Sequence, residues 1–259
     1  MIAASLGLLF ASSACAAQMY TVTDLGTLGG MSSYAYAINA SGQVVGYSYN
    51  TGHTAVRGFR TAPNRPINPA TDDLGTLGGA GWIEAHGIND SGQVVGIAYT
   101  TTNNTTWHAF RTAPNRPINP ATDDLGTLGG VHSYAYGIND SGQVVGYSLT
   151  KSWYGGDCHA FRTAPNRSIN SATDDLGPLG GSGCIEAHGI NDSGQVVGES
   201  AGHAFRTAAN VRINAASDDL GKLRGTYSAA NGINASGGVW HEVTASRAAA
   251  PVSSPGAGG

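Results

Sequence analysis

The chain has 259 residues, a formal net charge of −4 and only 12% charged residues. This composition excludes a broad basic surface, so nucleic acid is not an expected partner. Glycine is abundant, with 39 residues, and this abundance disfavours long helices and favours turn-rich β structure.

Residues 1–17 carry the pattern of a secretory signal peptide. An uncharged apolar run from Ile2 to Ala14 precedes Ala14-Cys15-Ala16, a small-x-small pattern typical of signal peptidase sites. The run is too short to span a bilayer. We therefore expect export from a bacterial cell, to the periplasm or the extracellular space, and no membrane span.

Residues 18–244 contain five copies of one segment of about 50 residues. A fixed period of this length indicates a repeat architecture in which each unit buries its apolar face against its neighbours. The phrase Asp-Leu-Gly marks each copy, with its leucine at Leu25, Leu74, Leu125, Leu176 and Leu220. Residues 245–259, rich in Ala, Gly, Ser and Pro, are predicted to be a disordered tail.

Each copy contains four short stretches with strand character. In the second copy they are Ile83–Ile88, Gln93–Ala98, His108–Arg111 and Asp124–Leu128, each bounded by Gly, Pro, Asn or Asp. Four strands per unit, repeated in this way, are typical of a β-propeller blade. The predicted fold is therefore all-β, a β-propeller of about five four-stranded blades, with strands A to D in each.

Closure of the ring is less regular than the blades. Tyr20–Leu25 has the pattern of a D strand with no blade before it, so it is expected to complete the fifth blade. The fifth copy departs from the others after residue 237. Either Val239–Thr244 supplies the missing pairing or the reading frame is truncated.

The loops differ between the two faces expected of a propeller. The A–B step and the C–D step are constant in copies one to four, whereas the B–C loop changes in length from copy to copy. Varied loops on a rigid scaffold usually carry binding. Four B–C residues are therefore candidate ligand contacts through their aromatic rings: Tyr99, Trp107, Trp153 and Tyr154.

Three phrases recur in order in the copies: Gly-Ile-Asn-Asp-Ser-Gly-Gln-Val-Val-Gly, His-Ala-Phe and Asp-Leu-Gly-Thr-Leu-Gly-Gly. Over residues 20–238 the chain resembles the HAF family of extracellular bacterial repeats. The first copy departs from this pattern with Arg57-Gly58-Phe59. The resemblance implies export and a propeller-like repeat, and it brings neither an established activity nor catalytic residues.

Two motifs have a structural interpretation that outweighs the chemical one. Asn-Asp-Ser-Gly, as at Asn89–Gly92, is oxygen-rich like a calcium loop but lacks the spacing of one, and it suits a tight hairpin turn. Gly198–Gly202 matches G-x-S-x-G, yet that motif needs a following helix and a strand is predicted there.

The recurring His108, His159 and His203 are expected to hold blades together.

Two Glu–His pairs alternate with tyrosines along the copies. Glu84 with His86, and Glu186 with His188, lie two residues apart on predicted A strands and are expected to point the same way toward the mouth of a central channel. Carboxylate and imidazole together bind a cation or move a proton. Packing between blades is the alternative, because Tyr34 and Tyr36 take these places in the first copy.

Two cysteines remain after the predicted signal peptide. Cys158 precedes the C strand of the third copy, and Cys184 precedes the A strand of the fourth. Both belong to the varied rim, and an exported protein permits their pairing. A disulfide and two separate thiols both remain open at this point.

Two functions from different classes follow. The first is a secreted binding module that recognises a glycan, a cell-surface component or a small molecule through its B–C loops. The alternative is a calcium-dependent hydrolase of small esters or lactones, in which Glu84 and Glu186 hold the metal and His86 or His188 acts as base. Whether the chain is an enzyme is undecided by its sequence.

Overall fold

The computed structural model describes residues 22–101, 105–151, 157–180, 183–222 and 225–244. Over these ranges the protein is all-β, with fifteen strands and no helix, and no segment of it is a helix that could cross a membrane. The strands are β1 Gly29–Ile38, β2 Val44–Asn50, β3 Val56–Arg60, β4 Ile83–Ile88, β5 Val94–Tyr99, β6 Trp107–Arg111, β7 Ser133–Ile138, β8 Val144–Leu149, β9 Cys158–Arg162, β10 Ile185–Ile190, β11 Val196–Ser200, β12 His203–Arg206, β13 Asp219–Gly221, β14 Tyr227–Ile233 and β15 Val239–Thr244.

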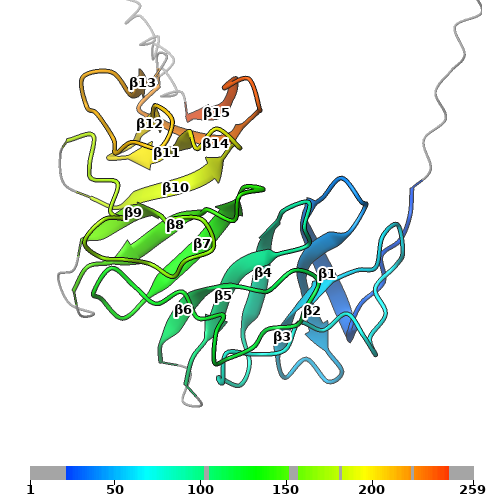
Figure 1. Ribbon diagram of the computed structural model, residues 1–259. Helices are drawn as coiled ribbons and strands as arrows, with labels where there is room; N and C mark the ends of the chain where they lie inside the picture. Colours follow the sequence, from blue (N-terminus) through cyan, green and yellow to red (C-terminus); the bar gives the residue numbers. More distant parts are fainter. Residues whose placement is uncertain (1–21, 102–104, 152–156, 181–182, 223–224, 245–259) are drawn as a thin grey trace, which may run out of the picture.

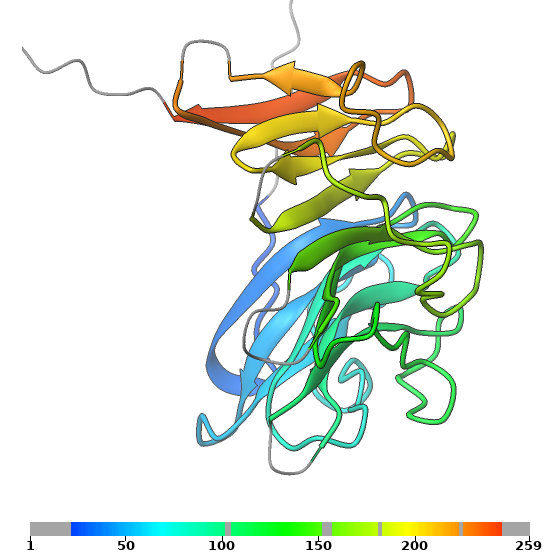
Figure 2. The ribbon, with the colours of Figure 1, turned by 90° about the vertical axis from the view of Figure 1, so that its left-hand side faces the viewer.

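These strands form five small antiparallel sheets, one for each repeat. The orders are β1-β2-β3, β4-β5-β6, β7-β8-β9, β10-β11-β12-β13 and β14-β15. The sheets follow one another along an open arc, with β1, β4, β7, β10 and β14 on its concave side (Figure 1). Each of these inner strands packs against the inner strand of the next repeat. Figure 2 shows the same stack of sheets from the side.

The fourth strand of each repeat is shorter than the sequence predicted. In the second repeat, Asp124–Leu128 contributes one isolated bridge, between Asp124 and Phe110, and only the fourth repeat has a named strand there, β13. The Asp124 carboxylate accepts the Gly126 N–H at 2.8 Å, and Gly126 has a φ of +71°. This turn bends the chain away from the sheet directly after the bridge.

The predicted completion of the fifth sheet by Tyr20–Leu25 is not formed in the described part of that segment. Residues 20 and 21 lie outside the described residues, and the Leu25 carbonyl accepts the Ile67 N–H of the first repeat at 2.8 Å. Leu74, Leu125 and Leu176 make the same contact with the following repeat. Val239–Thr244 forms β15, which pairs with β14. The fifth sheet therefore has two strands in the described residues.

The hydrophobic core lies between successive sheets. One phenylalanine of the C strand is fully buried in each of the first four repeats: Phe59, Phe110, Phe161 and Phe205. Each of these rings contributes about 2–3 kcal/mol of burial to folding. Val45 of the first repeat packs in one cluster with Ile83 and Val94 of the second. Each repeat thus completes its core with side chains of its neighbour.

The Asn-Asp-Ser-Gly segments form tight hairpin turns. In the second repeat, the Asn89 side chain accepts the Gln93 N–H at 3.0 Å and the Ser91 hydroxyl at 2.8 Å. The Asn89 amide donates to the Asn139 carbonyl of the next repeat at 3.1 Å. The side-chain oxygen of Asn89 therefore stabilises the turn, and its side-chain N–H group joins the second repeat to the third.

Candidate functional site

The first three junctions between repeats pair the same two positions at the varied rim. One position opens the C strand, and the other directly precedes or opens the A strand of the next repeat. Val56 bridges Trp82 in a parallel arrangement, and Trp107 bridges His132 in the same way. At the third junction the corresponding residues, Cys158 and Cys184, form a disulfide with a Cα–Cα distance of 4.7 Å. The structure thus settles a pairing that the sequence left open.

The second junction holds a tightly stacked ring pair. The rings of Trp107 and His132 lie 3.4 Å apart at an interplanar angle of 5°, and His132 is only 3% exposed. Burial lowers the pKa of His132 to about 4. Its Nδ1 accepts the Trp107 backbone N–H at 3.3 Å, which requires that nitrogen to be unprotonated. The neutral imidazole therefore supports the indole of Trp107.

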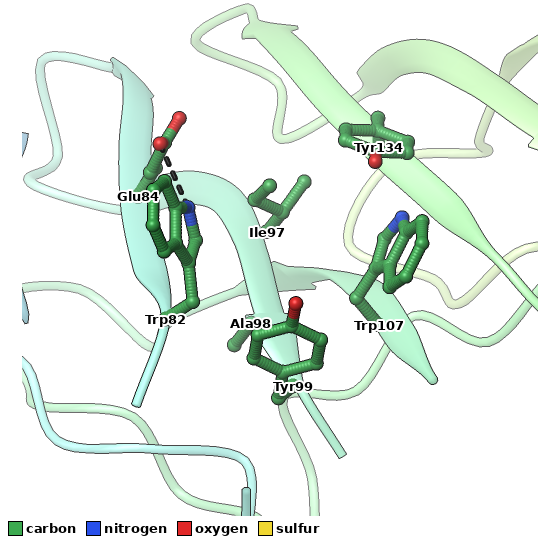
Figure 3. Close-up of a pocket in the computed structure, with 7 residues that line it drawn as sticks. All are labelled: Trp82, Glu84, Ile97, Ala98, Tyr99, Trp107 and Tyr134. Carbon is green, nitrogen blue, oxygen red and sulfur yellow. Dashed lines mark hydrogen bonds between the residues drawn. The ribbon is translucent and has the colours of Figure 1, made fainter. Parts of the chain in front are cut away.

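Beside this stack lies an aromatic pocket of about 370 Å³ (Figure 3). Two indoles, Trp82 and Trp107, stand on opposite sides of it, and Ile97 lies between them. The Trp82 Nε1 donates to Glu84 Oε1 at 2.8 Å, and Trp82 is 41% exposed. The lining residues are Trp82, Glu84, Ile97, Ala98, Tyr99, Trp107 and Tyr134.

A single residue difference distinguishes the second repeat from the first and the third at this pocket. Ile97 occupies the position that Tyr47 and Tyr147 hold in the first and third repeats, as the strand registers show. Tyr47 stacks on Tyr34 at 4.8 Å, and Tyr147 stacks on Tyr134 at 4.5 Å. In those repeats the phenol ring fills the space next to the inner strand, whereas the smaller Ile97 leaves it open.

Sequence reasoning found part of this pocket. Tyr99 and Trp107 line it, as expected of B–C residues, whereas Trp153 and Tyr154 lie outside the described residues. It missed Trp82 and Ile97. Trp82 carried a signal, because the other copies have serine, histidine, cysteine or tyrosine at this position and only the second has an exposed indole.

A second hollow, of about 360 Å³, is lined by one side chain from each of the five repeats: Tyr36, His86, Tyr136, His188 and Asn231. In each inner strand the register with the second strand shifts at the residue that lines this hollow. In β4, for example, it shifts between Ala85 and Gly87, at His86. Such a bulge re-aims the side chain that it carries. His86 lines this hollow and Glu84 lines the aromatic pocket, and the ends of the two side chains are nevertheless in contact.

The two Glu–His pairs are separated by Tyr136. The His86 and Tyr136 rings meet edge-on with their centroids 5.6 Å apart, and the His188 and Tyr136 rings do so at 5.7 Å. The Glu84 Oε2–His86 Nε2 distance is 3.2 Å, close enough for an ion pair but without hydrogen-bond geometry. The Glu186 Oε2–His188 Nε2 distance is 3.6 Å. The imidazoles of His86 and His188 therefore line the same hollow, and each contacts the Tyr136 ring.

Burial alone would lower the pKa of His188, but the neighbouring Glu186 carboxylate outweighs it and the pKa lies above its ordinary value. The Tyr136 hydroxyl donates to Glu186 Oε2 at 3.4 Å, and burial together with this carboxylate raises the pKa of Tyr136. The Glu186 carboxylate therefore favours the protonated form of His188.

The predicted metal ligands are already engaged. Glu84 contacts Trp82 and His86 with its two oxygens. Glu186 Oε1 lies 3.5 Å from Cys184 Sγ, and its Oε2 faces His188. Cys158, Cys184 and Glu186 bring ligand-type atoms within 4.8 Å of one another, but the two sulfurs are bonded to each other. Both carboxylates therefore already bind protein groups, and their remaining lone pairs are what a cation or another ligand would use.

The recurring histidines bind an aspartate of their own repeat. The Nδ1 atoms of His108 and His159 lie 2.8 and 2.7 Å from Asp124 and Asp175. In the first repeat Arg57 replaces histidine and pairs with Asp73 at 2.9 Å. These residues join the C strand to the following segment within one repeat, whereas we expected contacts between blades.

The G-x-S-x-G segment is part of a hairpin. Ser200 ends β11 and is 1% exposed, and Ala201 and Gly202 form the turn into β12. A buried serine that is followed by a strand does not have the strand–turn–helix setting of a nucleophile elbow.

Searches with the sequence and the structure matched no family model, no curated protein and no solved structure.

Proposed function

We propose that this protein is an exported carbohydrate-binding module and that the pocket between Trp82 and Trp107 receives a sugar ring. The observation that carries this proposal is the pair of indoles on opposite sides of one cavity, with the Glu84 carboxylate at its edge. Indole faces contact the apolar C–H faces of sugars, and carboxylate oxygens accept their hydroxyl protons.

The size and the lining of the pocket support a small, partly polar ligand. A cavity of about 370 Å³ falls within the range of small-molecule sites, which combine apolar walls with a few placed polar groups. The neutral His132 supports the Trp107 ring from behind, so this wall of the pocket is already ordered before a ligand arrives. Pre-organisation reduces the entropy cost of binding.

The setting of the pocket belongs to the same proposal. We propose that the arc of sheets is part of a propeller-like array of the HAF type that is displayed outside a bacterial cell. The disulfide between Cys158 and Cys184 supports an oxidising location, because such bonds persist outside the cytosol. A glycan or another cell-surface component is the partner that this location favours.

Two substitutions test the pocket in different ways. Trp82→Ala removes one exposed wall and is expected to weaken binding by about 30-fold, or about 2 kcal/mol, as is typical of a central aromatic contact. Ile97→Tyr reproduces the residue that fills this space in the neighbouring repeats, so it should block the pocket and leave the fold intact. Binding is measured on a glycan array and by retention on insoluble polysaccharides.

Tyr227→Ala is the matched control, because Tyr227 occupies the position of Trp82 in the fifth repeat and is likewise exposed. It should bind like the wild type. Equal retention of the wild type, Trp82→Ala and Ile97→Tyr on every glycan that binds would contradict the proposal, as would the absence of binding to any glycan.

A further inference from the structure

The junction between repeats has a fixed hydrophobic pattern. A valine of the B strand of one repeat is fully buried in a cluster with residues of the next repeat; these valines are Val45, Val95, Val145 and Val197. In the next repeat the partners are the last isoleucine of the A strand and the first valine of the B strand. At the second junction, for example, Val95 clusters with Val144 and with the partly buried Ile138.

The first sheet carries the receiving half of this contact without a partner in the described residues. Ile38 corresponds to Ile138 in the strand register and is 66% exposed. Val44 corresponds to Val144 and is partly exposed, whereas Val144 is fully buried. The cluster of the first sheet contains Leu28, Phe59 and Ile67 with Val44 at its edge, and no valine of a preceding sheet contributes to it.

The last sheet carries the other half. Trp240 pairs with Gly232 in β14, which is the register of Val95 opposite Gly87 and of Val197 opposite Gly189. Trp240 therefore occupies the position of the buried valines, yet it is 66% exposed. A hollow of about 440 Å³ lies beside it, lined by Gly232, Ile233, Asn234, Gly238, Val239 and Trp240.

A polar ladder runs through the junctions in the same direction. The side-chain amide of each turn asparagine donates to the carbonyl of its counterpart in the next repeat at 3.1 Å; the series is Asn39, Asn89, Asn139, Asn191 and Asn234. Asn234 ends this ladder with an amide donor, and Asn39 begins it with a carbonyl. The two end sheets therefore have complementary polar and apolar groups.

We propose that a second copy of this chain docks head to tail, with Trp240 and Asn234 of one copy against Ile38 and Asn39 of the next. β1 and β14–β15 belong to separate sheets at opposite ends of the arc (Figure 1). Two different surfaces are used, so the contact is heterologous, and it closes a ring or continues as a chain according to the rotation between copies. The contact between copies would have the same arrangement of groups as the four internal junctions between repeats.

Analytical ultracentrifugation of the full chain over a wide range of concentrations tests the proposal. The wild type is expected to associate as its concentration rises. Ile38→Glu and Trp240→Glu each place a charge in the contact and should raise the dissociation constant at least about tenfold. Both side chains are exposed in the single copy, so circular dichroism spectra should match those of the wild type. Val211→Glu is the matched control and should associate normally, because Val211 is 47% exposed and its carbonyl accepts from Arg162 of the third repeat, which belongs to neither end sheet.

Mixing the two variants separates this contact from a symmetric one. Ile38→Glu retains an intact Trp240 surface, and Trp240→Glu retains an intact Ile38 surface, so an equimolar mixture should form a dimer and stop there. A wild type that stays monomeric at every concentration would overturn the proposal. Variants that associate as the wild type does, or a mixture that stays monomeric, would also overturn it.

Discussion

Small differences between equivalent residues create the individual features of this repetitive protein. Ile97, where the first and third repeats have tyrosine, opens the aromatic pocket. His132 is the third repeat's counterpart of Trp82, and it provides the ring on which Trp107 stacks. The positions are set by the repeat, and their chemistry is set by single side chains. The pocket is therefore a property of one junction, although every junction has the same backbone pattern.

His132 makes the stability of the folded protein sensitive to acid. Its pKa is lowered to about 4 in the folded protein because the ring is buried, whereas the ordinary histidine value is about 6.5. Between these values the unfolded chain binds a proton that the folded chain does not, so stability falls as the pH drops from about 6.5 to about 4. Thermal unfolding followed across this range should show a decreasing melting temperature.

His132→Phe keeps a flat ring against Trp107 and cannot titrate. It should lessen the acid-dependent loss of stability, although it also removes the acceptor of the Trp107 N–H. The comparison therefore uses the slope of melting temperature against pH rather than its absolute value. An identical slope in the variant and the wild type would show that His132 does not cause the effect.

His188 has the opposite dependence. Its pKa is raised in the folded protein by the Glu186 carboxylate in spite of burial. Its contribution to stability is therefore fully present below about pH 6.5, the ordinary histidine value, and is lost as the pH rises through the folded pKa. His188→Gln should therefore lessen the decrease of melting temperature as the pH rises above about 6.5. An unchanged decrease in the variant would assign it to other groups.

The tight A–B turn is the element that both ends a hairpin and joins two repeats. Asn139 accepts from Ser141 and from the Gln143 N–H, and donates to Gln143 and to the Asn191 carbonyl. It is 3% exposed. Buried groups left without partners cost about 1–3 kcal/mol each, so this side chain contributes more than the turn alone requires.

Asn139→Ala is expected to reduce the free energy of unfolding by about 3 kcal/mol, because it breaks a buried network. Asp140→Ala, at the exposed neighbouring position, loses the acceptor for the Asp90 N–H at 2.9 Å and should cost about 1 kcal/mol or less. Urea unfolding of both variants measures the difference. Equal costs would mean that the asparagine ladder does not hold the repeats together.

At the scale of the whole molecule, the structure is a series of junctions, and one of them is covalent. The Cys158–Cys184 disulfide joins the third repeat to the fourth across a sequence separation of 26 residues. Closing a loop of this size stabilises the folded state by about 3 kcal/mol, because it restricts the unfolded chain.

Replacing both cysteines by serine should therefore lower the urea midpoint, and a reductant should have the same effect on the wild type. The double variant should not respond to the reductant, which makes it the control for that treatment. A wild type whose midpoint is unchanged by complete reduction would contradict a stabilising role for the bond.

The sequence by itself determined the repeat, the all-β class, most strand positions and the turns. Ile83–Ile88 is a strand with the bounds that the sequence predicted, and the Asn-Asp-Ser-Gly segments are hairpin turns. These features depend on local patterns, namely alternation, glycine position and side chains that bond their own backbone, and the repetition of each pattern strengthened its interpretation.

Only the tertiary structure decided how the repeats meet. The bulges in the inner strands, the short fourth strands and the pocket that Ile97 leaves open depend on neighbouring strands. The arc itself depends on contacts such as that of Gln43 with Asn115, 72 residues apart. Contacts at such separation depend on the packing of whole sheets, which no local pattern in the chain encodes.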